Sequence, residues 1–326
     1  MDTYNNLSSQ EHPQFGKPAG FVTAEDVANR FDKEIKGKTF LITGCGLASL
    51  GQQLAWTIAS YQPKLLILCG RSDVRLRLLA NNLRLRNPGL NVRHEAFDLA
   101  DLGQVRNAAK RINASDTVDV IICNAGIMMH PLRKTVDGIE SQLAINSTAH
   151  FVLVNMLLPK MIANGGGRVV TTTSGAYRYS GVRWDDPNYD DKPAEYNSFM
   201  AYASSKTADV LFAAALAHRY GSKGIIATSV DIGGAVASTN IGAHLSDAEL
   251  EPFVDSGVPP RTVGEACASQ LVGALDPSVK EHNGALLLFC QPVEPEAEHA
   301  KGEENERRFW ELSEKLENSN VEFRTV

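Results

Sequence analysis

Two side chains suited to acid–base chemistry, Tyr202 and Lys206, stand four positions apart in a stretch predicted to be helical over residues 199–220. That spacing places both on one helix face, about one turn apart. A phenol has an ordinary pKa of about 10 and is a poor catalyst at neutral pH, but a neighbouring ammonium group favours its ionised form. The pair could therefore transfer a proton to or from a substrate oxygen, although this spacing is also common on helices without a catalytic role.

A glycine-rich turn, TGCGLASLG, covers residues 43–51 between a predicted strand and a predicted helix. Glycines let the backbone approach a pyrophosphate, and the first amides of the helix face its negative charge. The alternative is a tight strand-to-helix turn that binds nothing. The flanking elements favour dinucleotide binding by the residues of this turn, namely Thr43, Gly44, Ser49, Leu50 and Gly51.

The second predicted strand ends at Cys69-Gly70-Arg71. A carboxylate at this place usually binds the ribose 2′-hydroxyl of NAD, whereas an arginine accommodates the 2′-phosphate of NADP. The first carboxylate, Asp73, comes two residues later and could instead cap the next helix. Arg71 therefore favours NADP(H), the alternative being a solvated surface charge.

Seven short apolar runs alternate with helix-length segments along the chain. Strands that are apolar on both faces and separated by helices predict a parallel sheet covered on both sides, a doubly wound Rossmann-type α/β fold. We expect a helical N-terminal extension over residues 1–35, a dinucleotide-binding and catalytic domain over 36–291, and a charged C-terminal helix over 292–326. The seven predicted strands cover residues 38–43, 64–69, 91–97, 118–123, 168–173, 224–230 and 285–290.

Composition excludes several classes of function. The 326 residues carry a formal charge of −6, which disfavours nucleic-acid binding. No run approaches the roughly 18 apolar residues of a membrane span, and the polar start lacks a secretory signal, so we expect a cytoplasmic protein. The five cysteines are scattered without a CxxC pair, which indicates neither a metal site nor a disulfide framework.

From about residue 36 to residue 291 the chain resembles the short-chain dehydrogenase/reductases, and the segments around ITGCGLASLG and EYNSFMAYASSKTADVLFA are similar to the retinol-dehydrogenase-like branch found in filamentous fungi. The family's motifs have counterparts here in the expected order. They are the glycine turn, Asp98-Leu99, Asn124-Ala125-Gly126, Asn146, Ser174 and Tyr202 with Lys206.

The resemblance implies a role for each of these residues. Tyr202 would be the general acid or base, Lys206 would lower its pKa and bind the nicotinamide ribose, and Ser174 would hold the substrate oxygen. Asn146 would order a water molecule that links Lys206 to solvent. Taken singly, Ser174 could instead cap a strand end and Asn146 could be a satisfied helix-interface amide. Asp98, Leu99, Asn124, Ala125 and Gly126 would line the cofactor channel, with Asp98 beside the adenine.

Two features depart from the family pattern. The glycine turn is one residue longer than usual, with Ala48 near the place of its middle glycine. The Pro-Gly that usually follows the sixth strand is replaced by Ile232-Gly233-Gly234, and the lost proline removes a fixed φ angle. We expect Gly233 and either Thr239 or Ser238 to contact the cofactor there.

The sequence thus predicts an NADP(H)-dependent oxidoreductase for a lipophilic carbonyl or alcohol, a ketoreductase of secondary metabolism by resemblance. Relatives often form homodimers through the helices after strands four and five, so a homodimer is one expected assembly. A catalytically silent NADP(H)-binding regulator is the alternative, and a serine hydrolase is disfavoured because no GxSxG motif occurs. Five aromatic residues could form a substrate wall or could pack their own segment onto the body: Tyr177, Tyr179, Trp184, Tyr189 and Tyr196.

Overall fold

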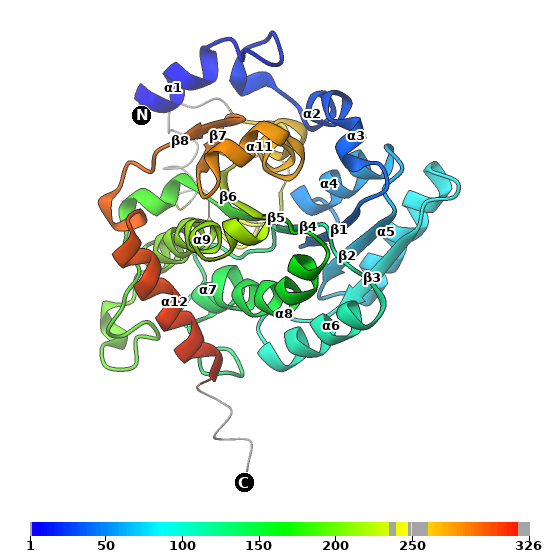
Figure 1. Ribbon diagram of the computed structural model, residues 1–326. Coiled ribbons are helices and arrows are strands. Elements are labelled where there is room, and N and C mark those ends of the chain that lie inside the picture. The colour runs from blue at the N-terminus through cyan, green and yellow to red at the C-terminus, as the bar shows by residue number, and fades with distance from the viewer. Residues whose placement is uncertain (1, 235–238, 247–248, 250–259, 319–326) are drawn as a thin grey trace.

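A computed structural model describes residues 2–234, 239–246, 249 and 260–318 (Figure 1). The strands are β1 (Thr39–Thr43), β2 (Leu65–Gly70), β3 (Val92–Ala96), β4 (Val120–Cys123), β5 (Gly167–Thr173), β6 (Ile225–Asp231), β7 (Leu286–Leu288) and β8 (Gln291–Val293). The helices are α1 (Asp2–Ser9), α2 (Ala24–Arg30), α3 (Asp32–Ile35), α4 (Leu50–Ala59), α5 (Asp73–Arg86), α6 (Leu102–Ser115), α7 (Ser141–Leu143), α8 (Ala149–Ala163), α9 (Ser198–Tyr220), α11 (Val263–Leu275) and α12 (Glu303–Asn318).

The sheet has the order β3-β2-β1-β4-β5-β6-β7-β8, and its first seven strands run parallel. Strands β2 and β3 are added on one side of β1, and β4 and the later strands on the other side. The strand order therefore switches between β1 and β4, which is where ligands bind in a doubly wound sheet. The Rossmann-type fold is confirmed, but the prediction of seven strands is wrong. An eighth strand, β8, pairs antiparallel with β7 and places Leu286 opposite Val293.

The hairpin between β7 and β8 explains why the last strand was not predicted from the sequence. Its two connecting residues, Phe289 and Cys290, both have positive φ angles, of 50° and 66°. Such turns favour glycine or asparagine. An apolar Phe-Cys pair at this place therefore predicts a longer β7 rather than a turn. The Cys290 amide donates a hydrogen bond to the Ser269 hydroxyl over 2.9 Å, which holds this turn against α11.

Helices cover both faces of the sheet (Figure 1). Alternate residues of β1 point to opposite layers: Leu41 belongs to the apolar cluster with α6, α8 and α9, and Phe40 and Ile42 to the cluster with α2, α4, α5 and α11. Between α7 and α8 the helical chain makes one π-helical turn, Ala144–Thr148. Such turns are frequent at functional sites.

The terminal segments pack on this core. Thr23 and Asp26 form a reciprocal capping box at the start of α2. At the other end, α12 buries Phe309 and Trp310 against Phe151 of α8, and it lies beside α9 in Figure 1. The helix therefore covers surface on α8 and α9, the two helices through which relatives were expected to pair.

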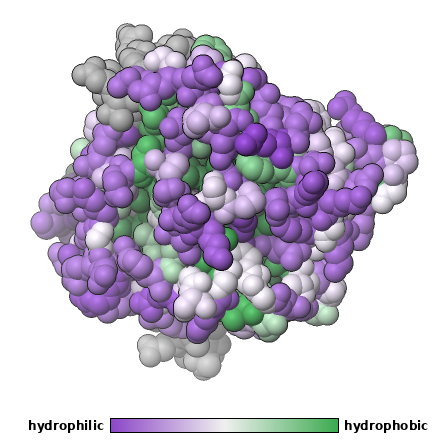
Figure 2. Space-filling model, turned by 45° about the horizontal axis from the view of Figure 1, so that its top comes forward, coloured by the Kyte–Doolittle hydropathy of each residue, from purple (hydrophilic) through white to green (hydrophobic). Residues whose placement is uncertain are grey.

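Polar side chains predominate on the face shown in Figure 2, with apolar ones gathered in patches between them. In the described part of the chain, no helix combines the length and the apolar character that crossing a bilayer demands.

Candidate active site

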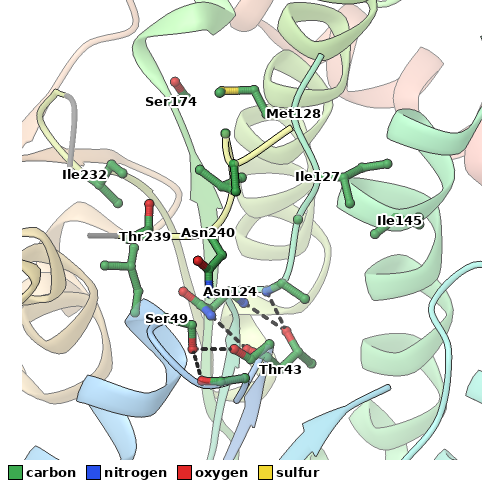
Figure 3. Close-up of a pocket in the computed structure, with 18 of the residues that line it drawn as sticks. Thr43, Ser49, Asn124, Ile127, Met128, Ile145, Ser174, Ile232, Thr239 and Asn240 are labelled. Carbon is green, nitrogen blue, oxygen red and sulfur yellow. Dashed lines mark hydrogen bonds between the residues drawn. The ribbon is translucent and has the colours of Figure 1, made fainter. Parts of the chain in front are cut away.

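A cavity of about 1500 Å³ opens where the parallel strands end. Its walls come from the segments after each of the strands β1 to β6, and Figure 3 shows part of them. Four predicted site residues, Gly51, Asn146, Lys206 and Gly233, are not part of its lining, and Ser238 lies outside the described residues. The predicted residues that do line it are Thr43, Gly44, Ser49, Leu50, Arg71, Asp98, Leu99, Asn124, Ala125, Gly126, Ser174, Tyr202 and Thr239.

The glycine turn is shaped by close backbone contacts. Gly44 has a φ angle of +77°, and a Cβ on Gly51 would lie 2.6 Å from the Gly44 carbonyl oxygen, so only glycine fits at Gly51. Ser49 caps α4, accepting a hydrogen bond from the Gln52 amide and donating to the Gly46 carbonyl over 2.7 Å. Ala48, which stands where the family has a glycine, adopts a φ angle of 51° that ordinarily favours glycine. The N-terminal amides of α4 are thereby directed towards the cavity.

Thr43 links this turn to the segment after β4. Its hydroxyl oxygen accepts hydrogen bonds from the amides of Asn124 and Ala125, over 2.9 and 3.0 Å. The Asn124 side chain returns a bond of 2.9 Å to the Thr43 carbonyl oxygen (Figure 3). Two walls of the cavity are therefore held together by one side chain.

Arg71 is exposed at the edge of the cavity, and Arg75, which the sequence analysis did not single out, also lines it. The candidate carboxylate Asp73 is not among the lining residues. It pairs instead with Arg77 and with His94, 3.0 Å away. The cap of α5 is Ser72, so the cavity edge after β2 presents cations to a ligand.

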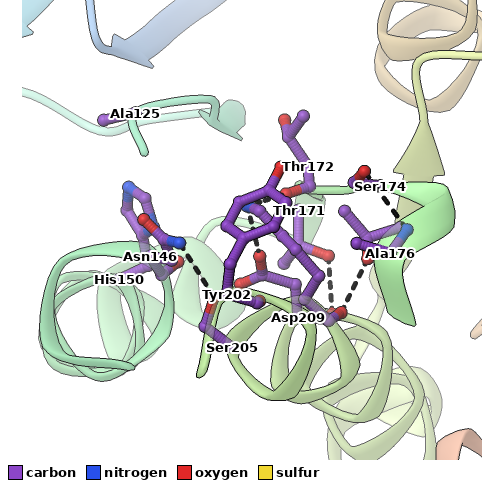
Figure 4. Close-up of polar contacts among 12 residues, drawn as sticks. Ala125, Asn146, His150, Thr171, Thr172, Ser174, Ala176, Tyr202, Ser205 and Asp209 are labelled. Atoms are coloured by element: carbon purple, nitrogen blue, oxygen red, sulfur yellow. Dashed lines mark hydrogen bonds and ion pairs between the residues drawn. The ribbon is translucent and has the colours of Figure 1, made fainter. Parts of the chain in front are cut away.

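Tyr202 is buried at the wall of the cavity, where only 4% of the residue is exposed. Ser174 lines the same wall, and its hydroxyl accepts a hydrogen bond of 3.3 Å from the Ala176 amide; Figure 4 shows Ser174 and Tyr202 together. Burial raises the pKa of Tyr202, while the ammonium of Lys206 and the Ser174 hydroxyl oppose that rise without cancelling it. Lys206 thus acts on the pKa in the direction that the resemblance implies, but desolvation outweighs the cation, and the phenol keeps its proton at neutral pH.

Lys206 approaches the Tyr202 ring from behind the wall, its Nζ 5.8 Å from the ring centroid. Its ammonium donates to the Thr172 carbonyl oxygen over 2.8 Å and to the carboxylate of Asp209 over 2.9 Å. Asp209 was not singled out from the sequence. Its position three residues after a candidate catalytic lysine was the only available signal.

Asn146 lies in the π-helical turn, and its side chain braces the segment after β4. The amide oxygen accepts from the Ile127 amide over 2.8 Å, and the amide nitrogen donates to the Ile127 carbonyl and to the Ser205 hydroxyl. The Asn146 carbonyl oxygen is 2.8 Å from the ring of His150, whose other nitrogen lies 2.9 Å from the Thr43 hydroxyl. One chain of contacts thus joins α9, α8 and β1.

The predicted aromatic wall is mostly structural. Tyr179 alone of the five lines the cavity, in edge contact with Phe199 at 5.3 Å. Tyr177 and Tyr189 are buried, and the Tyr196 hydroxyl donates to a backbone carbonyl, so packing describes them better than ligand contact. The apolar surface near Tyr202 also includes residues that the sequence analysis missed, namely Met128, Met129, Phe199 and Ile241.

Comparison with known proteins agrees with this geometry. A family model described as short chain dehydrogenase matches residues 38–185. The chain is 36% identical to the oxidoreductase fscI of Fusarium equiseti, over 66% of this chain and 94% of that protein. It is 30% identical to the short-chain dehydrogenase/reductase prx1 of Penicillium roqueforti, over 91% and 90% of the two chains.

The chain belongs to the short-chain dehydrogenase/reductase family. Within this family of oxidoreductases it is also similar to human retinol dehydrogenase 13, with 35% identity over 64% of this chain and 62% of that one.

Solved structures of other proteins share its fold. A gluconate 5-dehydrogenase from Burkholderia cenocepacia, in complex with NADP and tartrate, matches with a TM-score of 0.60 and 23% identity over 77% of this chain and 93% of that chain. An uncharacterized protein from Mycobacterium paratuberculosis matches with a TM-score of 0.66 and 27% identity, over 87% and 94% of the two chains.

Proposed function

We propose that this protein reduces a lipophilic carbonyl compound with NADPH. The observation that carries the proposal is a buried, protonated phenol, Tyr202, which lines a large cavity together with Ser174. Reduction of a carbonyl needs a proton donor beside the substrate oxygen, and a phenol with a raised pKa holds the proton that this step requires.

The residues at the cavity fit a nicotinamide dinucleotide. A Cβ on Gly46, which also lines the cavity, would meet nothing within 4 Å, so the turn leaves open space above the start of α4 for a diphosphate. Arg71 and Arg75 would hold the 2′-phosphate of NADPH, since charge-assisted bonds from guanidinium groups suit phosphate oxygens. Asp98 would lie towards the adenine, and Asn124-Ala125-Gly126 would line the channel. The bound cofactor would supply the hydride.

The chain's own residues would then handle the substrate oxygen and its proton. The Ser174 hydroxyl would donate a hydrogen bond to that oxygen and orient it beside Tyr202. Tyr202 would transfer its proton to the oxygen as negative charge develops there. Lys206 would stabilise the phenolate that remains, through the same proximity that opposes the raised pKa of Tyr202 in the resting protein.

The substrate is proposed to be apolar and to contain an aromatic or extended unsaturated group. The support is the surface formed by Met128, Met129, Tyr179 and Phe199 close to Tyr202. Thioether and aromatic side chains pack well against flat apolar molecules. The name of the similar human retinol dehydrogenase 13 is compatible with such a substrate. The five cysteines are all unpaired, which fits a reducing cytoplasmic location.

A cofactor titration followed by a substrate screen tests this proposal. Quenching of protein fluorescence should show tighter binding of NADPH than of NADH, and NADPH should be consumed with at least one apolar ketone or aldehyde in a broad panel. Tight NADPH binding with no turnover across the panel would favour the silent binding protein instead. Failure to bind either dinucleotide would overturn both the proposed reductase function and the alternative of a silent binding protein.

A further inference from the structure

Asp209 is a buried carboxylate one helical turn beyond Lys206 on α9, and the proposed reaction does not use it. Its Oδ2 atom lies 2.9 Å from the ammonium nitrogen, and the two side chains are 6% and 3% exposed. Figure 4 shows Asp209 deep in the site with Tyr202. An ion pair this far from water requires a reason, because desolvating two charges costs about as much as their attraction returns.

The surroundings leave Lys206 as the principal partner of this carboxylate. Burial raises the pKa of Asp209 to about 7, and the ammonium of Lys206 opposes the rise. Two titratable groups packed nearby from other elements, Cys123 and His150, are neutral at pH 7. Burial raises the pKa of the Cys123 thiol on β4 well above its ordinary value, and lowers the pKa of His150 on α8 to about 4. Asp231 on β6 acts on Tyr202 in the same direction as Asp209, raising its pKa.

The consequence for Tyr202 follows from the net charge of the buried group. With Asp209 ionised, the set Tyr202, Lys206 and Asp209 is neutral, and loss of a proton gives a buried net charge of −1. Without that carboxylate the set would carry +1, and loss of a proton would make it neutral. In a medium of low polarity, the proton loss that leaves a neutral set is much easier than the one that leaves a charge of −1. This holds whichever of the two remaining groups, Tyr202 or Lys206, gives up the proton.

We propose that Asp209 is a positioning residue that acts as the counter-ion of Lys206, holding the ammonium beneath the phenol and opposing ionisation of Tyr202. The inference deepens the proposed function and rests on it for its catalytic meaning. The ion pair itself can be tested without turnover.

The direct test is ultraviolet titration of the phenol. Tyrosinate absorbance is followed against pH for the full chain and for Asp209→Asn, each corrected with the same protein carrying Tyr202→Phe. The Tyr202 phenol should titrate about one to two pH units lower in Asp209→Asn than in wild type. Thr171→Val is the matched control, because it removes the uncharged hydrogen bond of 2.8 Å from Thr171 to the Asp209 carbonyl and should leave the titration unchanged. An unchanged or raised titration in Asp209→Asn would overturn the proposal.

A second measurement covers the case in which Asp209→Asn does not fold. Lys206→Met leaves a lone buried carboxylate, whereas Lys206→Met with Asp209→Asn leaves no charge. The single variant should melt below the double variant, by a gap that widens from pH 5.5 towards pH 8.5, because the carboxyl group of the unfolded chain is ionised in this range while the buried one retains its proton. Equal melting temperatures across that range would show that the two groups are not a charge pair, and would overturn the inference.

Kinetics connect the ion pair to the reaction. In the reduction direction kcat/KM should fall at high pH as the phenol loses its proton, and in Asp209→Asn this fall should occur at lower pH by the shift seen in the absorbance titration. An absorbance shift without turnover on any carbonyl would leave the ion pair established and the proposed function refuted. Turnover without an absorbance shift would leave the proposed function supported and the role of the ion pair refuted.

Discussion

The hydroxyl of Thr43 offers a sharp test of how the cavity is assembled. Replacing Thr43 with valine keeps the shape of the side chain and removes the acceptor for two backbone amides, those of Asn124 and Ala125. It also removes the contact of 2.9 Å with His150. The substitution changes no charge and leaves β1 as apolar as before.

The cost can be worked out from these contacts. Leaving a buried donor unsatisfied costs about 1–3 kcal/mol. The Ala125 amide loses its acceptor, whereas the Asn124 amide keeps a bond of 3.1 Å to the Ile122 carbonyl, so the loss should be about 1–3 kcal/mol. For 326 residues, with an unfolding entropy of about 2.1 cal/mol/K per residue, this corresponds to a fall in melting temperature of roughly 1.5–4.5 °C. Thr43→Ser keeps the hydroxyl and should lose only the small contribution of one methyl group.

The assay compares the two variants by thermal unfolding with and without NADPH. Thr43→Val should melt well below Thr43→Ser, and NADPH should stabilise it less because the segment after β4 is no longer fixed to the glycine turn. Equal melting temperatures, or equal stabilisation by NADPH, would refute the assignment of Thr43 as the link between the two walls.

Three further predictions concern the cofactor edge, the C-terminal helix and acid stability. Arg71→Asp should weaken NADPH binding by about 10-fold or more and change NADH binding little, because a charge-assisted bond contributes about 1.5–3 kcal/mol. Equal effects on the two cofactors in a fluorescence titration would contradict the assignment of Arg71 to the 2′-phosphate. Arg77→Asp is the control, because Arg77 is not part of the cavity lining. Trp310→Ala should lower the free energy of unfolding by about 3–5 kcal/mol in urea titrations, because the ring is 4% exposed, and it should leave NADPH binding unchanged. His150 has a pKa of about 4 in the folded protein against 6.5 as its ordinary value, so below pH 6.5 the unfolded chain takes up a proton that the folded chain does not. Between pH 6.5 and pH 4 this should remove about 3 kcal/mol of stability that His150→Gln does not lose, and parallel stability curves for the two proteins would contradict it.

Much of the fold could be predicted because its signals are local. Runs such as residues 64–69 are apolar on both faces, and only a strand covered by helices on both sides accounts for that pattern. The capping box of Thr23 and Asp26 can also be recognised from the types and spacing of its residues. The same kind of box, Thr262 with Glu265, begins α11 and could have revealed that helix. The strand β8 was hidden because its turn uses Phe289 and Cys290 at positive φ angles.

The site could be predicted as a set of residue types but not as a set of contacts. Arg71, Ser174 and Tyr202 were identified from the sequence, and all three line one cavity. The net direction of the Tyr202 pKa was missed because it depends on burial, which no spacing rule reports. The pairing of Lys206 with Asp209 was missed for a similar reason, since a carboxylate three residues from a lysine is usually a solvated surface pair.

The most direct test of the central claim is the turnover of Tyr202→Phe at saturating NADPH with a carbonyl substrate that the wild-type protein accepts. Binding of NADPH should remain close to that of wild type, while kcat should fall by at least about 100-fold, because the proton donor is lost and the shape of the site is kept. A variant that binds NADPH and reduces the substrate at nearly the wild-type rate would contradict the account.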